Sequence, residues 1–119
     1  TVLEQRWDEV ELIHGITSFY PWEARHLLTE LRECMNAGGK LVLEQPDAVY
    51  VAKAVQEDAR LVRWFFGDPR FCNPQHMNKW AYSPDSLYTL VREAGFQYAR
   101  STRALHHDPE RDFRMEATA

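Results

Sequence analysis

The stretches Asp8-Glu-Val-Glu-Leu-Ile-His-Gly-Ile16 and Gly38-Gly-Lys-Leu-Val-Leu-Glu44 decide the fold. In the first, apolar residues alternate with glutamates, which predicts a strand with one partly polar face that lies at the edge of a sheet. Between the two stretches, from Pro21 to Met35, apolar residues recur at the spacing of an amphipathic helix that the two glycines end. Strand, helix and strand in this order predict a βαβ unit, whose two strands pair in parallel.

Two further helices are expected after the second strand. Apolar positions recur from Asp47 to Phe66, and Ser83 with Pro84 begins another helix that Gly95 ends. Residues 67–82, between these helices, contain two prolines and three aromatic residues but no regular period. We predict a long loop with hydrophobic anchors there, and loops of that length are often functional.

The last part of the chain alternates again. Residues 96–105 and 112–118 predict two antiparallel strands joined by a turn around Asp108 and Pro109. We therefore expect an α/β fold, a partial Rossmann-like sheet that has parallel strands, a C-terminal antiparallel hairpin and helices packed on it. Residues 1–119 would form a single domain.

Composition limits the partners. With 14 basic and 18 acidic residues scattered along the chain, the net charge is −4, so nucleic acid is not expected as a partner. No apolar run approaches the roughly 18 residues that cross a bilayer, and the start does not resemble a signal peptide, so we expect a soluble cytoplasmic protein without a membrane partner. Cys34 and Cys72 form no C-x-x-C pair and are expected to be reduced core thiols.

Several segments follow one another in a distinctive order: the strand from Asp8, a helix that ends in Ala37-Gly38-Gly39, and a strand that ends in Glu44-Gln-Pro-Asp47. Residues 76–96 and 111–118 follow as a loop with a helix and as a terminal strand. In this order the segments resemble the second half of class I S-adenosylmethionine (SAM)-dependent methyltransferases, in which the turn is usually Pro-Gly-Gly. The resemblance implies a last strand placed between the second and third strands of this chain.

The resemblance also implies a function. It implies a SAM-dependent methyltransferase-like domain that transfers a methyl group to an unknown acceptor, with Gly15, Ile16, Thr17 and Ser18 beside the cofactor. The family's glycine-rich turn and its acidic ribose-binding residue have no counterpart here, so the chain resembles a truncated form with poor affinity for SAM and no activity of its own. The alternative is a non-catalytic dimerisation or binding module derived from the methyltransferase fold.

Two histidines are candidate catalytic residues. Methyl transfer from a sulfonium requires an aligned nucleophile and in some cases a base that takes a proton. His14, at the end of the first strand, is the first candidate base and His76 is the second, and for each the alternative is a hydrogen-bonded structural residue. The adjacent His106 and His107 are explained by turn chemistry, and we expect no metal site.

Candidate substrate-binding residues lie at the carboxyl end of the second strand. Glu44, Gln45 and Asp47 occupy the edge where doubly wound sheets bind ligands, although Asp47 is also suited to cap the next helix. From the aromatic residues, Tyr20 and Trp80 are candidate stacking surfaces, and the alternative is that they belong to the core or to an interface.

The first strand and the aromatic segment beside it, Phe19 to Trp22, predict an assembly. An uncovered strand edge pairs readily with another strand, and exposed apolar surface marks interfaces. We therefore expect a homodimer with two-fold symmetry, built from the first strand and this aromatic segment.

Overall fold

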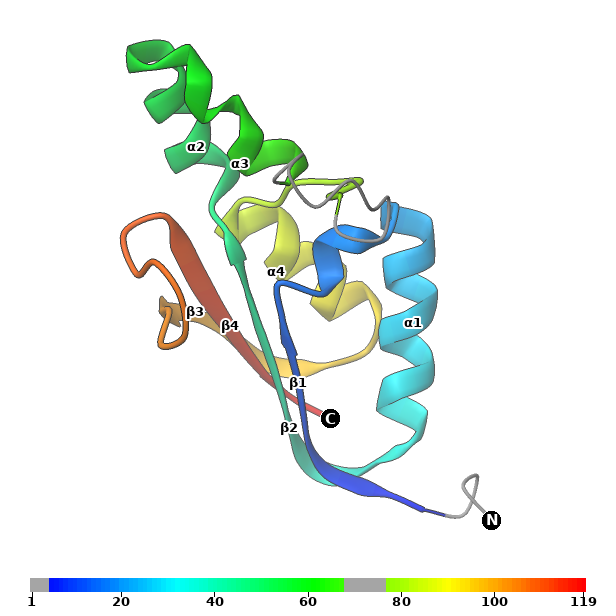
Figure 1. Cartoon of the computed structure of the whole chain (residues 1–119). Helices are drawn as coiled ribbons and strands as arrows, with labels where there is room; N and C mark the ends of the chain where they lie inside the picture. Colours follow the sequence, from blue (N-terminus) through cyan, green and yellow to red (C-terminus); the bar gives the residue numbers. More distant parts are fainter. Residues whose placement is uncertain (1–4, 68–76) are drawn as a thin grey trace.

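The computed structural model describes residues 5–67 and 77–119. Its elements form one mixed sheet with helices on it (Figure 1). In chain order they are β1 (Trp7–Ile13), η2 (Ile16–Ser18), α1 (Pro21–Glu33), β2 (Met35–Pro46), α2 (Ala48–Glu57), η3 (Ala59–Val62), α3 (Arg63–Phe66), α4 (Pro84–Glu93), β3 (Gln97–Arg103) and β4 (Asp112–Thr118), where η marks a 3₁₀ turn.

The sheet has the order β1-β2-β4-β3. β1 pairs in parallel with β2, with Leu12 opposite Leu43, while β4 pairs in antiparallel fashion with both β2 and β3. The predicted βαβ unit and C-terminal hairpin are therefore confirmed, as is the last strand between the second and third. β1 lies at the edge, as its two glutamates indicated.

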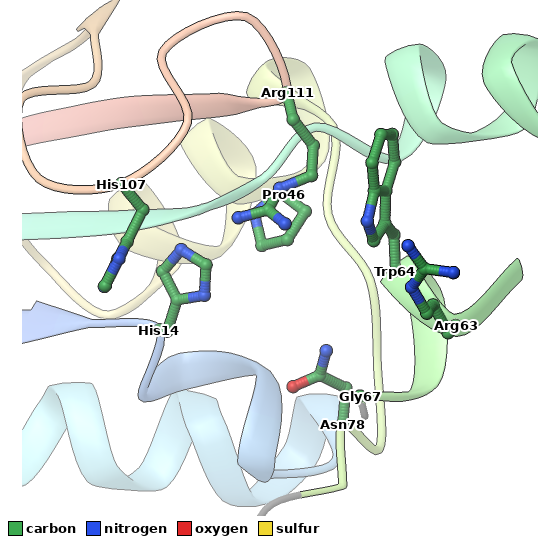
Figure 2. Close-up of a pocket in the computed structure, with 8 residues that line it drawn as sticks. All are labelled: His14, Pro46, Arg63, Trp64, Gly67, Asn78, His107 and Arg111. Atoms are coloured by element: carbon green, nitrogen blue, oxygen red, sulfur yellow. The ribbon is translucent and has the colours of Figure 1, made fainter. Parts of the chain in front are cut away.

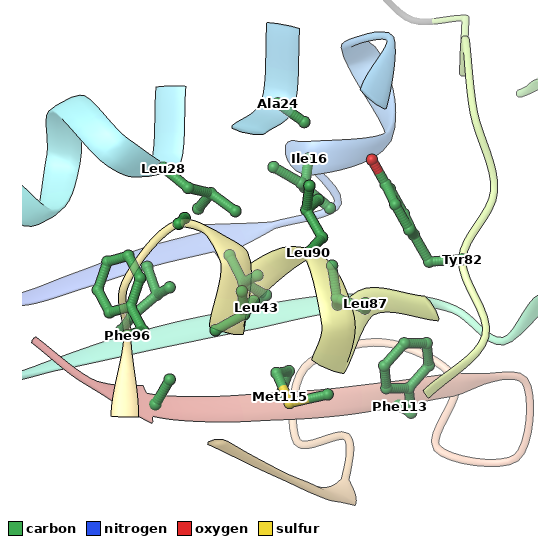
Figure 3. Close-up of a cluster of buried hydrophobic side chains, with 14 of the residues drawn as sticks. Ile16, Ala24, Leu28, Leu43, Tyr82, Leu87, Leu90, Phe96, Phe113 and Met115 are labelled. Carbon is green, nitrogen blue, oxygen red and sulfur yellow. The ribbon is translucent and has the colours of Figure 1, made fainter. Parts of the chain in front are cut away.

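The core lies between the sheet and the two helices α1 and α4, which cover the same face (Figures 1 and 3). Leu28 of α1 and Leu87 of α4 are completely buried and face Leu43 of β2 and Met115 of β4. The periodicity of each helix therefore gave the correct buried face, and α2 with α3 extends beyond the carboxyl end of β2. No helix in the described parts of the chain has the length and apolar character needed to span a membrane.

The turn between α1 and β2 differs from the prediction. The helix ends at Glu33, and the strand begins at Met35 because the backbone N–H of Trp7 donates to the carbonyl of Cys34 and so extends the β1–β2 pairing. Cys34 is exposed, so the predicted core thiol is wrong for this residue, while Cys72 lies outside the described residues. Gly38 has the expected left-handed backbone, with φ +82°, but within β2.

The helix predicted from Asp47 to Phe66 is interrupted at Asp58. This residue has extended backbone, and its carboxylate accepts a hydrogen bond from the backbone N–H of Arg60 at 3.0 Å. The carboxylate thereby caps a new turn, which divides the region into α2, η3 and α3. A side chain that competes with the helix in this way leaves the apolar period unchanged, so the period alone predicts one helix.

The helix predicted between Ser83 and Gly95, which is α4 in the structure, begins and ends as predicted. Ser83 Oγ accepts the N–H of Ser86 at 3.1 Å, Pro84 occupies the first turn, and Gly95 ends the helix with φ +99°. Of the loop expected over residues 67–82, residues 68–76 lie outside the described part of the chain.

Candidate functional site

A cavity of about 300 Å³ opens beyond the carboxyl ends of β1 and β2 (Figure 2). The described residues that line it are His14, Pro46, Arg63, Trp64, Gly67, Asn78, His107 and Arg111. Parallel strands of an α/β sheet present their ligands at this edge, because loops there leave the sheet and spread apart. The cavity is therefore the first candidate for a binding site.

His14 is the first residue after β1. Its backbone N–H donates to the carbonyl of Glu44 at 2.7 Å, and its φ is +58°, in the left-handed region. That conformation costs a residue other than glycine roughly 1–2 kcal/mol. The turn directs the imidazole away from the strand, toward the start of β4.

The imidazole of His14 is bound to a buried carboxylate. Nε2 lies 2.6 Å from Oδ2 of Asp112, whose side chain is completely buried, and Arg111 donates to both carboxylate oxygens, at 2.7 and 3.2 Å. Burial would raise the pKa of Asp112, but the hydrogen bonds from His14 and Arg111 outweigh it, and the pKa lies below its ordinary value. Asp112 is therefore ionised near neutral pH.

The ionised carboxylate assigns the tautomer of His14. Because a carboxylate without a proton only accepts hydrogen bonds, Nε2 of His14 must carry the proton. In the neutral imidazole, Nδ1 then holds a free electron pair, and Figure 2 shows the ring edge with this nitrogen turned toward the cavity. The pair has the geometry of a general base held in place by a carboxylate.

Other side chains complete the walls. The ring of His107 lies edge-on to that of His14, with centroids 4.5 Å apart, and the guanidinium of Arg111 lies 5.5 Å from the ring centre of Trp64. Asn78 accepts a hydrogen bond from Thr17 Oγ1 at 2.8 Å through its side-chain oxygen. Its amide nitrogen therefore remains a donor, and it points toward the cavity in Figure 2.

Comparison with known proteins identifies this architecture. No family model and no curated protein matches the sequence. Solved structures do match: an O-methyltransferase family protein from Burkholderia thailandensis (TM-score 0.64, 18% identity, 98% of this chain and 31% of that one) and a SAM-dependent methyltransferase from Methanosarcina mazei (0.65, 16%, 98% and 62%). Human N-acetylserotonin methyltransferase in complex with SAM matches with a TM-score of 0.60 at 15% identity, over 93% of this chain and 29% of that one.

The chain has the fold of class I SAM-dependent methyltransferases. It spans about a third of the length of several of these proteins, and less than two thirds of the length of the Methanosarcina protein. At this level of identity the likeness establishes the fold, and its chemistry has to be argued from the residues of the chain.

Within the methyltransferase fold, the four predicted cofactor residues have different environments. Ile16 is buried in the core, and Thr17 is buried with its hydroxyl on Asn78 and its carbonyl accepting the N–H of Lys79 at 2.7 Å. Gly15 and Ser18 are partly exposed. Gly15 and Ser18 are therefore accessible from the surface, whereas Ile16 and Thr17 pack inside the turn. A cofactor-binding role for the four residues stays a prediction.

Glu44 and Gln45, the predicted substrate residues on β2, are buried and are not among the described residues that line the cavity. Glu44 is completely buried and binds the side chains of His106 and Arg114, both at 2.8 Å, and Gln45 donates to the carbonyl of Phe113. Burial opposes the ionisation of Glu44, but these hydrogen bonds and those from the backbone N–H groups of Leu105 and His106 lower its pKa to about 2. Its contacts join β2 to β4 and to the segment between β3 and β4.

Asp47 accepts the N–H of Val49 at 2.9 Å and caps α2, the alternative that its sequence position left open. Tyr20 stacks on Trp22, with ring centroids 4.8 Å apart, and Trp80 is half exposed. A binding role for these residues stays a prediction. His76, the second candidate base, lies outside the described residues.

Arg63, Trp64, Asn78, Arg111 and Asp112 are among the residues of the cavity region to which the sequence assigned no site role. Asp112 carried a usable signal, because a carboxylate at the start of a strand predicted to be central is buried and requires partners. Its partner His14 follows another strand, β1, so the pair depends on the register of the sheet.

Within the described residues, no group of three His, Cys, Asp or Glu side chains is arranged to hold a metal ion.

Proposed function

We propose that the chain forms the acceptor-binding side of a SAM-dependent methyltransferase that acts on a small-molecule acceptor. The observation that carries this proposal is the pairing of His14 with the buried carboxylate of Asp112, at a cavity beyond the carboxyl ends of the parallel strands. Among the structures of similar fold, one is a complex with SAM and one holds S-adenosylhomocysteine (SAH). The shared fold and the candidate base together favour methyl transfer over simple binding.

In this proposal each residue of the pair has a defined role. His14 receives at Nδ1 the proton of the acceptor group that is to be methylated, and positioned bases of this kind contribute about 10²–10⁴-fold to rate. Asp112 holds the imidazole in one tautomer and stabilises the positive charge that develops on it. Bound SAM supplies the electrophilic methyl group.

The described residues fit part of SAM. Gly15 allows close approach of a ligand and Ser18 offers a hydroxyl, both on the turn that follows β1. Nucleotide-binding α/β folds also use a glycine-rich turn and an acidic residue for the ribose, and this sequence contains no G-x-G-x-G segment. We infer that the chain alone binds SAM weakly and is inactive by itself.

A titration of the isotope-labelled chain with SAM and SAH tests the proposal. We expect saturable chemical-shift changes centred on Gly15 and Ser18, with a dissociation constant above about 100 μM, which corresponds to less than roughly 5–6 kcal/mol. ATP is the control ligand, because it shares the adenosine and lacks the sulfonium. If SAM leaves the amides of residues 14–18 unchanged, or if ATP shifts them equally, the chain does not recognise the methyl donor.

The free edge of β1 favours a second candidate function, a non-catalytic homodimerisation module. In the described chain β1 pairs with β2 alone, and alternation along a parallel ladder places the N–H groups of Glu9, Glu11 and Ile13 on the open side, because that of His14 points to β2. Tyr20 and Trp22, where α1 begins, are 40% and 65% exposed, so they offer apolar surface. A two-fold dimer would bury both features, over roughly 1,600 Å² or more.

The charges of β1 give such a dimer a distinguishing property. Asp8, Glu9 and Glu11 are exposed, so two copies of the strand would bring like charges together. Salt screens repulsion of this kind, and at 1 M the screening length is about 3 Å. Association through β1 should therefore strengthen as the salt concentration rises, which few polar interfaces do.

A further inference from the structure

The cavity in front of His14 carries a concentration of cationic side chains in an acidic protein. Arg63 and Arg111 line it together with two imidazoles and one amide, and none of the lining residues that the structure describes is acidic. The whole chain has a net charge of −4. This local reversal of charge is the first observation on the class of ligand.

The carboxylate of Asp112 offsets only one of the two guanidinium charges. It is completely buried behind the wall and is shared between Arg111 and His14. Arg63 comes from a different element, α3, where it is exposed, and its guanidinium lies beside the ring of Trp64 in Figure 2. Arg63 and Arg111 both line the cavity, and in Figure 2 the ring of Trp64 stands between their guanidinium groups. With the carboxylate of Asp112 counted, the two guanidinium groups leave one net positive charge when both imidazoles are neutral.

An apolar cavity adjoins the cationic one. It has a volume of about 370 Å³ and is lined by Phe65, Phe66, Asn78, Lys79, Trp80 and Ala81. Asn78 belongs to both linings, and a third, small cavity shares Trp64 with the first and Phe65 with the second. The cationic and the apolar cavity therefore adjoin each other.

We propose that these adjoining cavities bind a small organic acid, with its carboxylate in the cavity lined by Arg63 and Arg111 and its apolar body along Phe65, Phe66 and Trp80. A planar carboxylate matches the paired N–H donors of a guanidinium, and apolar walls with a few fixed polar groups are typical of small-molecule sites. The inference rests on the proposed function in one respect, namely that the bound acid is the methyl acceptor. The acid site itself is independent of SAM.

The test compares two isosteric probes on the full chain without SAM. In a chemical-shift titration, naphthalene-2-carboxylate should bind at least about tenfold more tightly than the neutral naphthalene-2-carboxamide, a difference that corresponds to 1.4 kcal/mol. The shifts should include Asn78, Trp64 and Phe66. Equal affinity of the acid and the amide would overturn the proposal.

Variants separate the two ends of the site. Arg63→Gln should reduce the preference for the acid at least about fivefold, while Phe66→Ser should weaken acid and amide alike; both side chains are exposed, so folding should be unaffected. Arg25→Gln, on the exposed side of α1, is the matched control and should leave both affinities unchanged. If inorganic phosphate displaces the naphthoate at equal concentration, or if Arg63→Gln behaves like Arg25→Gln, the organic-acid site is refuted.

The same sample distinguishes this inference from the proposed function. The naphthoate titration contains no SAM, and the SAM titration at Gly15 and Ser18 contains no acid. Acid binding without SAM binding would leave the acid site standing and refute methyl transfer. SAM binding without any preference for the acid over the amide would refute the acid site and leave methyl transfer standing.

Discussion

Nε2 of His14 lies 2.6 Å from Oδ2 of Asp112, although 98 residues separate the two in the chain. The central strand β2 brings them together. Ile13, the last residue of β1, pairs with Glu44 in parallel, and Asp112, the first residue of β4, pairs with Pro46 in antiparallel fashion. The end of one neighbour and the beginning of the other thus meet at the same edge of the sheet, on either side of β2.

Replacement of this carboxylate should reverse the tautomer of His14. In Asp112→Asn, Arg111 still requires an oxygen, so the amide nitrogen faces Nε2 and donates to it, and the imidazole proton moves to Nδ1. The ¹⁵N shifts of the imidazole report this directly, and the exposed His26 serves as the control in the same spectrum. An assembled methyltransferase should lose about 10²–10⁴-fold in rate. An unchanged tautomer would show that Asp112 does not position His14.

The hydrogen bonds around Glu44 should make the free energy of unfolding depend on pH in the acid range. The pKa of Glu44 falls from 4.5 to about 2 on folding, so its contribution is complete above pH 4.5 and is lost as the pH falls toward 2. The full shift corresponds to ~3 kcal/mol, of which about 2 kcal/mol should be lost between pH 6 and pH 3. Urea unfolding at both pH values measures this loss.

Glu44→Gln removes the titrating group and should remove that part of the pH dependence, in addition to destabilising the protein at pH 6 because Arg114 loses a buried partner. Glu57→Gln, at the exposed end of α2, is the control and should retain the wild-type slope. Equal slopes for Glu44→Gln and the wild type would contradict the assignment.

The two adjacent glycines within β2, Gly38 and Gly39, should respond very differently to replacement by alanine. A Cβ at position 39 would lie 2.9 Å from the carbonyl oxygen of Asn36 and 3.1 Å from that of Asp8, which are backbone atoms that cannot move aside alone. Gly39→Ala should therefore cost about 1–3 kcal/mol. Gly38 has open space around it and a φ of +82°, so Gly38→Ala should cost only the left-handed backbone, roughly 1 kcal/mol. Thermal unfolding of both variants tests the order, which would be wrong if Gly38→Ala were the less stable.

The sequence predicted most of the fold because the signals for it are local. Apolar spacing predicted the buried faces, Ser83 and Gly95 gave both ends of α4, and the hairpin followed from alternation. The break in the helix at Asp58 was not predicted, because a single side-chain hydrogen bond causes it. The start of β2 at Met35 was not predicted, because it depends on pairing with Trp7, far away in the chain.

The candidate site was predictable only in part, because most of its residues are brought together by contacts between distant parts of the chain. His14 could be singled out because it follows a strand at the edge where ligands bind. Asp112, Arg63 and Asn78 come from three other elements, and only the sheet register and the path of α3 bring them to His14. Glu44 was predicted to bind substrate, and the spacing of residues in the sequence gives no sign that Arg114 and His106 bind its buried carboxylate.

Dimerisation through β1 can be tested at a residue that is not part of the core. Leu12 and Val10 pack against the core cluster, so their replacement would damage the fold itself. Glu11 is exposed, and its N–H faces the open edge, so Glu11→Pro removes one edge donor and leaves the pairing with β2 intact. We expect Glu11→Pro to be monomeric by light scattering under conditions in which the wild type is dimeric.

Glu11→Gln is the matched control for this experiment. It keeps the N–H and removes a negative charge, so a dimer joined at β1 should become tighter, and added salt should have less effect on it than on the wild type. A wild type that remains monomeric at micromolar concentration in both low and high salt would refute the dimer. A dimer that Glu11→Pro leaves unchanged would place the contact elsewhere, because pairing along β1 cannot proceed past a proline at the centre of the strand without losing the hydrogen bond that this N–H donates.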